Sequence, residues 1–400
     1  MKTSNTLNQS HEYVPVNTRV IGHLKGSAPG PTILFTAGMH GNEPSGIIAL
    51  QRFFKAFAST VAKGGKESIK GEVIALAGNI KALREGRRFI HRDLNRMWYW
   101  DPFTQQLPTH DPAVAETEEF LDITRVIHGA IEGRRGDMMF VDLHTTSVRS
   151  IPFVLLGDTL RNRDFALPIP VPKILGLEEQ LRGPLLSYIN ELGHISMAFE
   201  AGQHDDPASV DRHESFVWLC LQQAGVLPQK HSLQEQVAFH RKRLAAQAAG
   251  LKGFYELRYR FGLEEGDRFK MREGFVNFQR IDRYQPLAMH NGEQITASEK
   301  GRIFMPLYQD QGDDGFFVVR GIARFWLWLS RRMRFWNIEG LLPLLPGISR
   351  HPRLRDTLVL NTRIARWYGL QLFHLLGFRK RWTDGPNLLL ARRPHDIKAP

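Results

Sequence analysis

Five short runs of apolar residues, each bounded by turn residues, are spread over the first half of the chain. Their length and boundaries predict buried β-strands at 32–37, 72–77, 138–143, 151–156 and 195–199. Apolar residues at helical spacing lie between these runs and predict helices at 45–62, 112–132, 177–192 and 207–226. The last helix has the clearest start signal, with Asp206 as N-cap and Pro207 in the first helical position. Strands alternating with helices predict an α/β fold whose ligand site lies beyond the carboxyl ends of the strands.

The pattern changes after this α/β region. Residues 233–250 predict a connecting helix, and 253–320 contain short strand-like segments separated by glycine turns. The remaining chain predicts helices interrupted at Pro343, Pro346, Pro352 and Pro386. We therefore predict three parts: an α/β domain at 1–235, a small and mostly β domain at 236–320, and a basic, tryptophan-rich helical extension at 321–400.

Charge is distributed unevenly along the 400 residues. The net charge is +12, yet residues 321–400 hold 15 Lys and Arg against four Asp and Glu, which is +11. Five of the eight tryptophans lie in the same segment. The rest of the chain is close to neutral, so the extension is a different kind of segment from the α/β region.

The chain has a single cysteine, Cys220, and so cannot form an intrachain disulfide. Its first residues are polar and contain no apolar segment of the kind found in signal peptides. Both features predict a protein of the reducing cytoplasm. No uninterrupted apolar stretch approaches the roughly 20 residues of a membrane-spanning helix.

His40 and Glu43 lie close together in the stretch GMHGNEPSG, directly after an apolar run. A histidine and a glutamate at this spacing are just as common in a polar turn, so the pair alone leaves both interpretations open. Its position after a buried strand favours a ligand site, because α/β proteins build their sites there. The flanking Gly38, Gly41 and Gly46 would let the backbone turn sharply and come close to a ligand.

His144 ends a second apolar strand in VDLHTTS, and Asp142 lies two residues earlier on the same face. Alone, a histidine at a strand end predicts a hydrogen-bonded loop residue. With His40 and Glu43, it completes two imidazoles and one carboxylate, a ligand set of a catalytic zinc that keeps one position open for water. Asp142 could then orient His144 through a hydrogen bond.

Two further segments carry residues suited to anion binding and proton transfer. GRRFIHRDLNRMW contains Arg88, Asn95 and Arg96, and its alternative interpretation is a solvated basic loop. Guanidinium groups bind carboxylates in a bidentate manner and can stabilise an oxyanion. In MAFEAGQHDD, Glu200 ends an apolar strand, where an unpaired carboxylate would be costly. Beside a metal-activated water, that carboxylate would be a natural general base.

The four segments occur in the order and spacing of one known family. The sequence resembles the succinylglutamate desuccinylase/aspartoacylase family, which belongs to the zinc carboxypeptidase superfamily. The resemblance covers about 30–320 and includes the small β domain. It implies a mixed sheet flanked by helices, one Zn²⁺ per chain, and hydrolysis of the amide bond of a small N-acyl amino acid.

Carried over residue by residue, the resemblance makes His40, Glu43 and His144 the zinc ligands, with Asp93 supporting one of them. Glu200 would be the general base that takes a proton from the zinc-activated water and returns it to the leaving amine. Hydrolysis without this base would be slow, so we expect Glu200→Gln to lose most turnover while it retains zinc. His144→Ala should lose the metal.

The same resemblance assigns the basic segment to the substrate. Arg88 would stabilise the developing oxyanion, and Asn95 and Arg96 would hold the α-carboxylate of the amino acid. One position departs from the pattern. Aspartoacylase carries an arginine ten residues before its catalytic glutamate, where this chain has Asn190, and Arg182 is out of register. N-acetylaspartate is therefore in doubt as the substrate, and the acyl group and amine stay open.

Two other functional classes remain beside an N-acyl amino acid deacylase. One is a zinc carboxypeptidase that acts on a peptide or another carboxylate-bearing amide. The other is a non-catalytic membrane- or nucleic-acid-binding protein that keeps a hydrolase fold. The sequence also leaves the oligomeric state open, including a homo-oligomer.

The stretch RFWLWLSRRMRFW in the extension is both basic and aromatic. Its simplest interpretation is a helix packed on the catalytic domain with solvated arginines. A second is an amphipathic helix in peripheral contact with an anionic membrane, at the inner face of the cytoplasmic membrane. A third is nucleic-acid binding, which the same composition fits less well.

Overall fold

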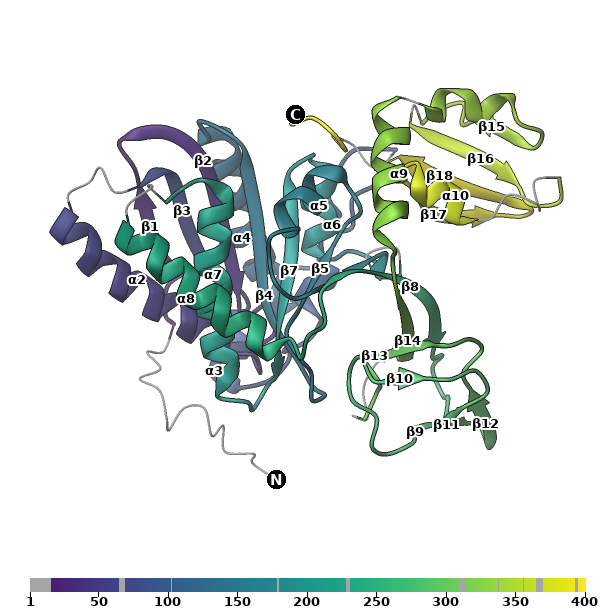
Figure 1. Cartoon of the computed structure of the whole chain (residues 1–400), viewed down its shortest axis with the longest axis horizontal. Coiled ribbons are helices and arrows are strands. Elements are labelled where there is room, and N and C mark those ends of the chain that lie inside the picture. The colour runs from purple at the N-terminus through teal and green to yellow at the C-terminus, as the bar shows by residue number, and fades with distance from the viewer. Residues whose placement is uncertain are drawn as a thin grey trace.

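The computed structural model places the chain around one large mixed β-sheet (Figure 1). It describes residues 16–64, 69–101, 103–177, 180–227, 231–308, 314–336, 338–354, 356–364, 370–392 and 395–400. The sheet has 11 strands in the order β1-β3-β2-β4-β7-β5-β6-β8-β14-β13-β10. Its first seven strands in chain order are β1 (Val20–Lys25), β2 (Ala28–Ala37), β3 (Lys70–Ala77), β4 (Met138–Thr146), β5 (Phe153–Leu156), β6 (Pro172–Leu175) and β7 (Ile195–Gln203).

All five predicted strands are confirmed, as β2, β3, β4, β5 and β7. Strands β2, β3, β4 and β7 are mutually parallel, whereas β5 runs antiparallel to β7. The sequence patterns missed β1 and β6. β1 is a half-exposed edge strand, and β6 contains a proline and a buried lysine, Lys173, so neither reads as an apolar run.

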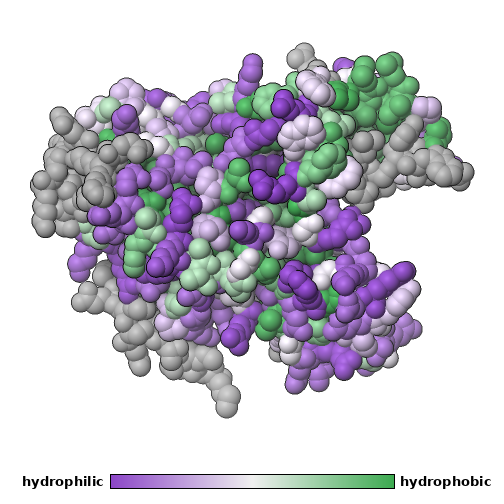
Figure 2. Space-filling model, viewed as in Figure 1, coloured by the Kyte–Doolittle hydropathy of each residue, from purple (hydrophilic) through white to green (hydrophobic). Residues whose placement is uncertain are grey.

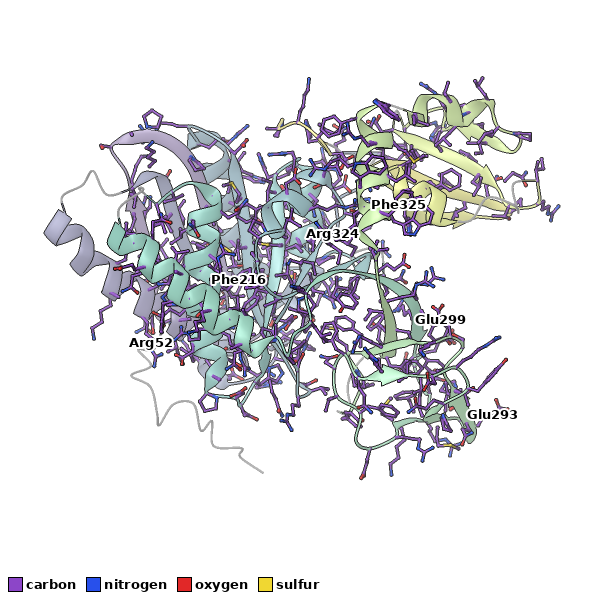
Figure 3. All side chains as sticks on the ribbon, viewed as in Figure 1. Arg52, Phe216, Glu293, Glu299, Arg324 and Phe325 are labelled. Carbon is purple, nitrogen blue, oxygen red and sulfur yellow. The ribbon has the colours of Figure 1, made fainter. Side chains whose placement is uncertain are left out.

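Helices cover both faces of this sheet, as the predicted α/β fold requires. The helices of the region are α2 (Ser45–Gly64), α3 (Ile80–Glu85), α4 (Ala115–Gly133), α5 (Leu160–Ala166), α6 (Leu185–Glu191), α7 (Ala208–Ala224) and α8 (His231–Gln247). Alternate residues of β2 point to opposite sides: Phe35 packs with α2 and α7, and Leu34 packs with α4 and α6. Figure 3 shows Phe216 of α7 in the first of these layers.

Two helix predictions differ from the structure. The predicted helix at 177–192 is limited to α6, because Gly183 has a left-handed φ of 75° and Pro184 directly precedes the helix. The helix predicted at 207–226 is α7, but Pro207 rather than Asp206 occupies its N-cap position. The Asp206 carboxylate still accepts a hydrogen bond from the backbone N–H of Ala208 at 3.0 Å. Asp206 therefore makes the expected capping hydrogen bond, although the helix begins one residue later than predicted.

The predicted mostly β region follows α8 and extends the central sheet. Its strands are β8 (Gly253–Gly262), β9 (Phe269–Met271), β10 (Arg280–Ile281), β11 (Pro286–His290), β12 (Glu293–Thr296), β13 (Gly301–Phe304) and β14 (Asp314–Gly321). β8 pairs in parallel with β6, and β14, β13 and β10 continue the sheet, while β12, β11 and β9 form a small separate sheet. The region is thus a continuation of the sheet plus a three-stranded layer. The boundaries at 235 and 320 stay predictions.

The prediction of a helical extension was wrong for most of 321–400. The described part contains α9 (Arg324–Phe335), the 3-10 helix η4 (Ile338–Leu344), α10 (Leu370–Leu375), and the strands β15 (Ile348–Arg350), β16 (Thr357–Asn361), β17 (Phe378–Asp384) and β18 (Asn387–Arg392). The strands form a four-stranded antiparallel sheet in the order β15-β16-β18-β17. This sheet, α10 and η4 share a small apolar core of their own. The short apolar runs TLVLN and NLLLA are its central strands.

Among the helices that the structure describes, none combines the length and the hydrophobicity of a membrane span.

Candidate metal centre

Three parallel strands end at the same edge of the sheet and deliver the predicted site residues there. His40 follows β2, His144 lies near the end of β4, and Glu200 lies near the end of β7. His144 and Glu200 are direct neighbours across the β4–β7 pair. The parallel arrangement therefore brings together residues that are 160 positions apart in the chain.

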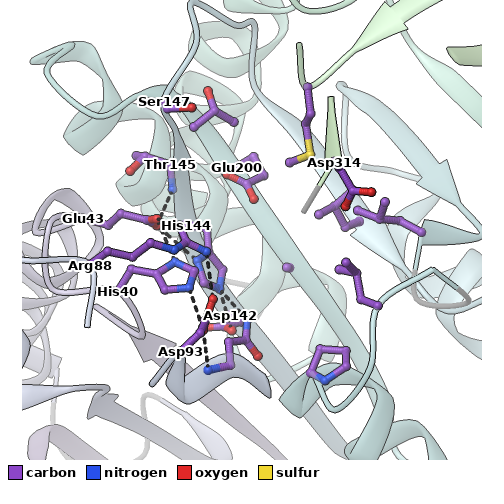
Figure 4. A pocket seen from close by; sticks show the side chains of 18 of the residues that line it. His40, Glu43, Arg88, Asp93, Asp142, His144, Thr145, Ser147, Glu200 and Asp314 are labelled. Carbon is purple, nitrogen blue, oxygen red and sulfur yellow. Dashed lines mark hydrogen bonds and ion pairs between the residues drawn. The ribbon is translucent and has the colours of Figure 1, made fainter. Parts of the chain in front are cut away.

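Both carboxylate oxygens of Glu43 face a histidine nitrogen (Figure 4). Its Oε1 lies 2.9 Å from His40 Nδ1, and its Oε2 lies 3.1 Å from His144 Nδ1. One ligand atom from each of these three buried residues lies within 4.8 Å of the others. The structure thus brings the two predicted imidazoles and the predicted carboxylate into one cluster.

The expected sharp turn is present at Gly38, and the glycines of GMHGNEPSG also lie close to a neighbouring helix. A Cβ on Gly41 would lie 2.1 Å from the backbone of Ala82 in α3, and one on Gly38 would lie 2.8 Å from the Leu83 side chain. Gly38 also has a left-handed φ of 70°. The glycines therefore let the loop pack tightly against α3, which holds His40 and Glu43 in place.

Two aspartates hold the far nitrogens of the histidine rings. Asp142 Oδ2 lies 2.8 Å from His144 Nε2, and Asp93 Oδ1 lies 3.2 Å from His40 Nε2. The hydroxyl of Thr36 donates to the other oxygen of Asp142 at 2.5 Å, which fixes that carboxylate. Carboxylates in these positions orient metal-binding histidines and make them better ligands.

The charges of the cluster depend on one another. Burial alone would raise the pKa of Glu43, but His40 and His144 hold it well below its usual value. Burial would lower the pKa of His144, but Asp142 and Glu43 raise it well above its usual value. Glu43 and His144 therefore stabilise the charged forms of each other.

Glu200 is the exception in this network. Its buried Oε2 atom has no hydrogen-bond partner among the described residues. Burial raises the pKa of Glu200 to about 8, with further increases from Glu43 and Asp142. A carboxyl group with this pKa exchanges protons near neutral pH, as a general base or acid requires.

The predicted anion-binding residues lie on one wall of the same site. Arg88 donates to Asp93 Oδ2 at 3.0 Å and lies 4.0 Å from Glu43 Oε1. The amide nitrogen of Asn95 lies 3.5 Å from His144 Nε2, and its oxygen accepts from the backbone N–H of Leu185. Arg96 is partly buried beside it and donates to the Asn95 carbonyl. The structure places all three at the cluster, and their roles stay predictions.

A cavity of about 1070 Å³ opens above the cluster. One side is lined by residues at the ends of β2, β4 and β7. The opposite side is lined by Arg260 of β8, by Met305, which directly follows β13, and by Asp314 of β14. Figure 4 shows Asp314 across the cavity from Glu200 and His144. The strands that extend the central sheet therefore narrow the access to the cluster.

Asn190 and Arg182 lie in different surroundings. Asn190 is buried away from the cavity, where its oxygen accepts a hydrogen bond from Asn162 at 2.8 Å. Arg182 instead lines the cavity, and its guanidinium stacks 4.3 Å from the centre of the Tyr99 ring. The loop before α6 thus brings Arg182 to the cavity, although its position in the sequence is out of register with the arginine of aspartoacylase.

Among the cavity residues that were not singled out from the sequence, His204 is a titratable one close to the cluster. His204 lines the cavity, and its Nδ1 lies 2.7 Å from the hydroxyl of Thr145, whose backbone N–H donates to Glu43. Burial lowers the pKa of His204, which favours the neutral form of its ring. The only signal in the sequence was its position four residues after Glu200 at the end of β7.

The donor set fits a zinc ion. Two imidazole nitrogens and a carboxylate lie close together, and aspartates contact the far nitrogen of each imidazole ring. All three residues also line the cavity, from which a water or substrate could reach a bound metal. Catalytic zinc sites have this composition and keep one position for water.

Comparison with known proteins agrees with this geometry. Residues 29–206 match the family model of the succinylglutamate desuccinylase/aspartoacylase catalytic domain. Succinylglutamate desuccinylase of Pseudomonas paraeruginosa is 38% identical over 69 residues, and that of Photorhabdus laumondii is 34% identical over 80 residues. These matches cover 17% and 20% of this chain, and 19% and 22% of the relatives. The chain thus matches only about a fifth of the length of these curated relatives.

Solved structures share the fold over a longer stretch. A succinylglutamate desuccinylase/aspartoacylase from Rhodobacter sphaeroides has a TM-score of 0.54 and 18% identity, over 75% of this chain and 88% of its own. The product-bound ectoine utilization protein EutE (DoeB) from Ruegeria pomeroyi has a TM-score of 0.52 and 18% identity, over 74% and 87%. At such identities the likeness shows the fold alone. Residues 29–206 are thus similar to the catalytic domain of the succinylglutamate desuccinylase/aspartoacylase family.

Proposed function

We propose that the protein is a zinc-dependent hydrolase that cleaves the amide bond of a small N-acyl amino acid. One observation carries the proposal: Glu43 is held between two histidine Nδ1 atoms, beside the unpaired, buried carboxyl group of Glu200. The first three residues form a metal site, and the fourth is a proton acceptor without a structural partner. A zinc ion held by His40, Glu43 and His144 would supply Lewis acidity and a water of lowered pKa.

The residues of the chain then divide the remaining work. Glu200 accepts the proton of the attacking water and returns it to the amine nitrogen as the carbon–nitrogen bond breaks. Arg88, which is fixed by Asp93, donates hydrogen bonds to the carbonyl oxygen as negative charge develops on it. The second task needs a donor that is fixed before the substrate arrives, and the hydrogen bond to Asp93 fixes Arg88.

The cavity supports a substrate that is small and anionic. Arg96 and Arg182 line it, and each can bind a carboxylate in a bidentate manner. The α-carboxylate of an amino acid fits beside Arg96 and Asn95, near the cluster. Arg182 lies exposed at the wall and could take a second carboxylate, on either the acyl group or the amino acid side chain.

A panel of substrates tests the proposal directly. Zinc-loaded protein should hydrolyse N-acetyl or N-succinyl amino acids, with the highest kcat/KM for a substrate that carries two carboxylates. Peptides with free C-termini are the contrasting substrates, and the walls of the cavity should make them poor ones. Faster cleavage of the peptides would instead identify a carboxypeptidase, and no hydrolysis of either class by zinc-loaded protein would reject an enzyme.

A further inference from the structure

Helix α9 departs from the usual pattern for a helix on the surface of a globular protein. Leu327 and Met333 pack against apolar clusters, but the largest of its buried side chains is ionic. Arg334 is fully buried, 2.9 Å from Asp158 Oδ2 and 3.1 Å from Asp396 Oδ1. The neighbouring Ser330 is also buried and accepts a hydrogen bond from Arg163. A surface helix normally turns its apolar side inward and its charged side to water.

The outer side of the same helix carries large apolar side chains. They continue into η4, which starts directly after α9, and form what we term the α9–η4 face: Phe325, Trp328, Phe335, Trp336, Leu341 and Leu344. Each of the six is between 53% and 79% exposed. Figure 2 shows hydrophobic surface gathered over η4, and Figure 3 shows Arg324 and Phe325 at the start of α9. A concentration of exposed apolar groups on this scale marks an interaction surface.

Arginines lie among these aromatic residues. Arg324 and Arg332 are exposed on the same side of α9, and the Arg332 guanidinium lies 5.8 Å from the centre of the Trp328 ring. The helix contains no acidic residue, and residues 321–400 have a net charge of +11. The partner of this face is therefore apolar and negatively charged at once.

We propose that the α9–η4 face binds the surface of an anionic lipid bilayer. Trp and Phe side chains enter the boundary between headgroups and acyl chains, and arginines beside them pair with anionic headgroups. The ion pairs of Arg334 and the hydrogen bond to Ser330 hold the helix on the protein. Its outer side therefore faces the bilayer without rearrangement of the helix.

Two other occupants fit the observations less well. A second copy of the chain in a two-fold dimer would place Arg324 and Arg332 of one copy close to those of the other, with like-charge repulsion. A nucleic acid would use the arginines and aromatic rings but gain nothing from Leu341 and Leu344, the latter 79% exposed. Of these three partners, a bilayer alone offers apolar contacts for the leucines and aromatic rings together with negative charge for the arginines.

Co-sedimentation of the full-length protein with lipid vesicles tests the proposal. Vesicles of phosphatidylcholine mixed with phosphatidylglycerol should bind it in a salt-sensitive manner, and vesicles of phosphatidylcholine alone should not. The double variant Trp328→Ser/Phe335→Ser should lower the partition coefficient by about tenfold or more. Arg332→Glu should lower it by about fivefold or more.

Matched substitutions elsewhere serve as controls. Phe239→Ser removes an equally exposed phenylalanine from α8, and Arg125→Glu reverses an exposed arginine on α4, so both should bind vesicles as the unaltered protein does. Absence of binding to anionic vesicles, or equal losses in the controls, would overturn the proposal. The proposal would also be overturned if the α9–η4 variants abolished a dimer in solution, or a salt-sensitive complex with DNA or RNA, but left vesicle binding unchanged. Hydrolysis of soluble substrates stays unchanged in all of these variants, so the result is independent of the proposed function.

Discussion

The metal centre and the junction between α9 and the catalytic region are both buried clusters of charged residues, but they are built differently. The metal centre gathers four carboxylates, from Glu43, Asp93, Asp142 and Glu200, around two imidazoles. The junction balances two arginines, Arg163 and Arg334, against two aspartates, Asp158 and Asp396.

This difference in charge balance suits one cluster to binding a cation and the other to holding two parts of the chain together. In the metal centre, Glu200 keeps an oxygen without a partner, and the carboxylates outnumber the fixed positive charges near the histidines. Such a cluster gains from an added cation. At the junction each arginine is paired with an aspartate and the opposite charges balance, although the buried Oδ2 of Asp396 also has no hydrogen-bond partner among the described residues. Substitutions in the first should change chemistry more than stability, and substitutions in the second should do the reverse.

The largest effect is expected at a ligand of the metal centre. His144→Ala removes one of the two imidazoles, so the purified protein should contain almost no zinc and show no hydrolysis above background. Elemental analysis and the substrate panel measure the two effects. His23→Ala, which changes a half-exposed histidine paired with Glu72, should keep a full complement of metal. Retention of one zinc per chain by His144→Ala would exclude His144 from the ligand set.

Glu200→Gln separates chemistry from metal binding. It keeps the size of the side chain but cannot accept the proton, so kcat should fall by about 10²–10⁴-fold while the zinc content is unchanged. Steady-state kinetics and elemental analysis of the same preparation give both values. Glu293→Gln, at an exposed strand position, is the matched control. Near-normal turnover would remove Glu200 from the mechanism.

At the junction the expected change is in stability. Arg334→Met leaves Asp158 and Asp396 without their shared partner, and the free energy of unfolding should fall by about 3–5 kcal/mol. Arg331→Met breaks a surface pair with Asp164 one turn away and should cost less than about 1 kcal/mol. Denaturant titration of both variants measures the difference. Similar losses in the two would mean that the buried junction does not hold α9 in place.

The smallest effect is expected for residues that contact the proposed metal ligands but not the metal itself. Asp142→Asn weakens the hydrogen bond to His144 Nε2, so zinc affinity should fall by about 10–100-fold while the metal-saturated protein stays folded. Thr36→Val, which removes only the donor to Asp142, should have a smaller effect in the same direction. Competition with a chelator measures both affinities. An unchanged affinity in Asp142→Asn would show that His144 is oriented by other contacts.

Five strands of the α/β region were predictable because their apolar runs are mostly buried and bounded by turn residues. β6 was not, since Pro172 and Lys173 interrupt its short sequence, and Lys173 is accommodated only because its amino group donates to the carbonyl of Ile169. The extension failed for a related reason. Runs such as NLLLA are too short to distinguish helix from strand, and only pairing between β16 and β18 decides between them.

The sequence by itself predicted that His40, Glu43 and His144 would come together, because the first two are close neighbours after one apolar strand and the third ends another. It also determined that the extension is basic and aromatic. The tertiary structure alone decided that Asn190 lies outside the cavity and that Arg182 lies within it, since loop paths do not follow sequence register. It also decided which side of α9 faces the protein: Arg334 finds Asp158 and Asp396 there, and residues so distant in sequence meet only through the fold.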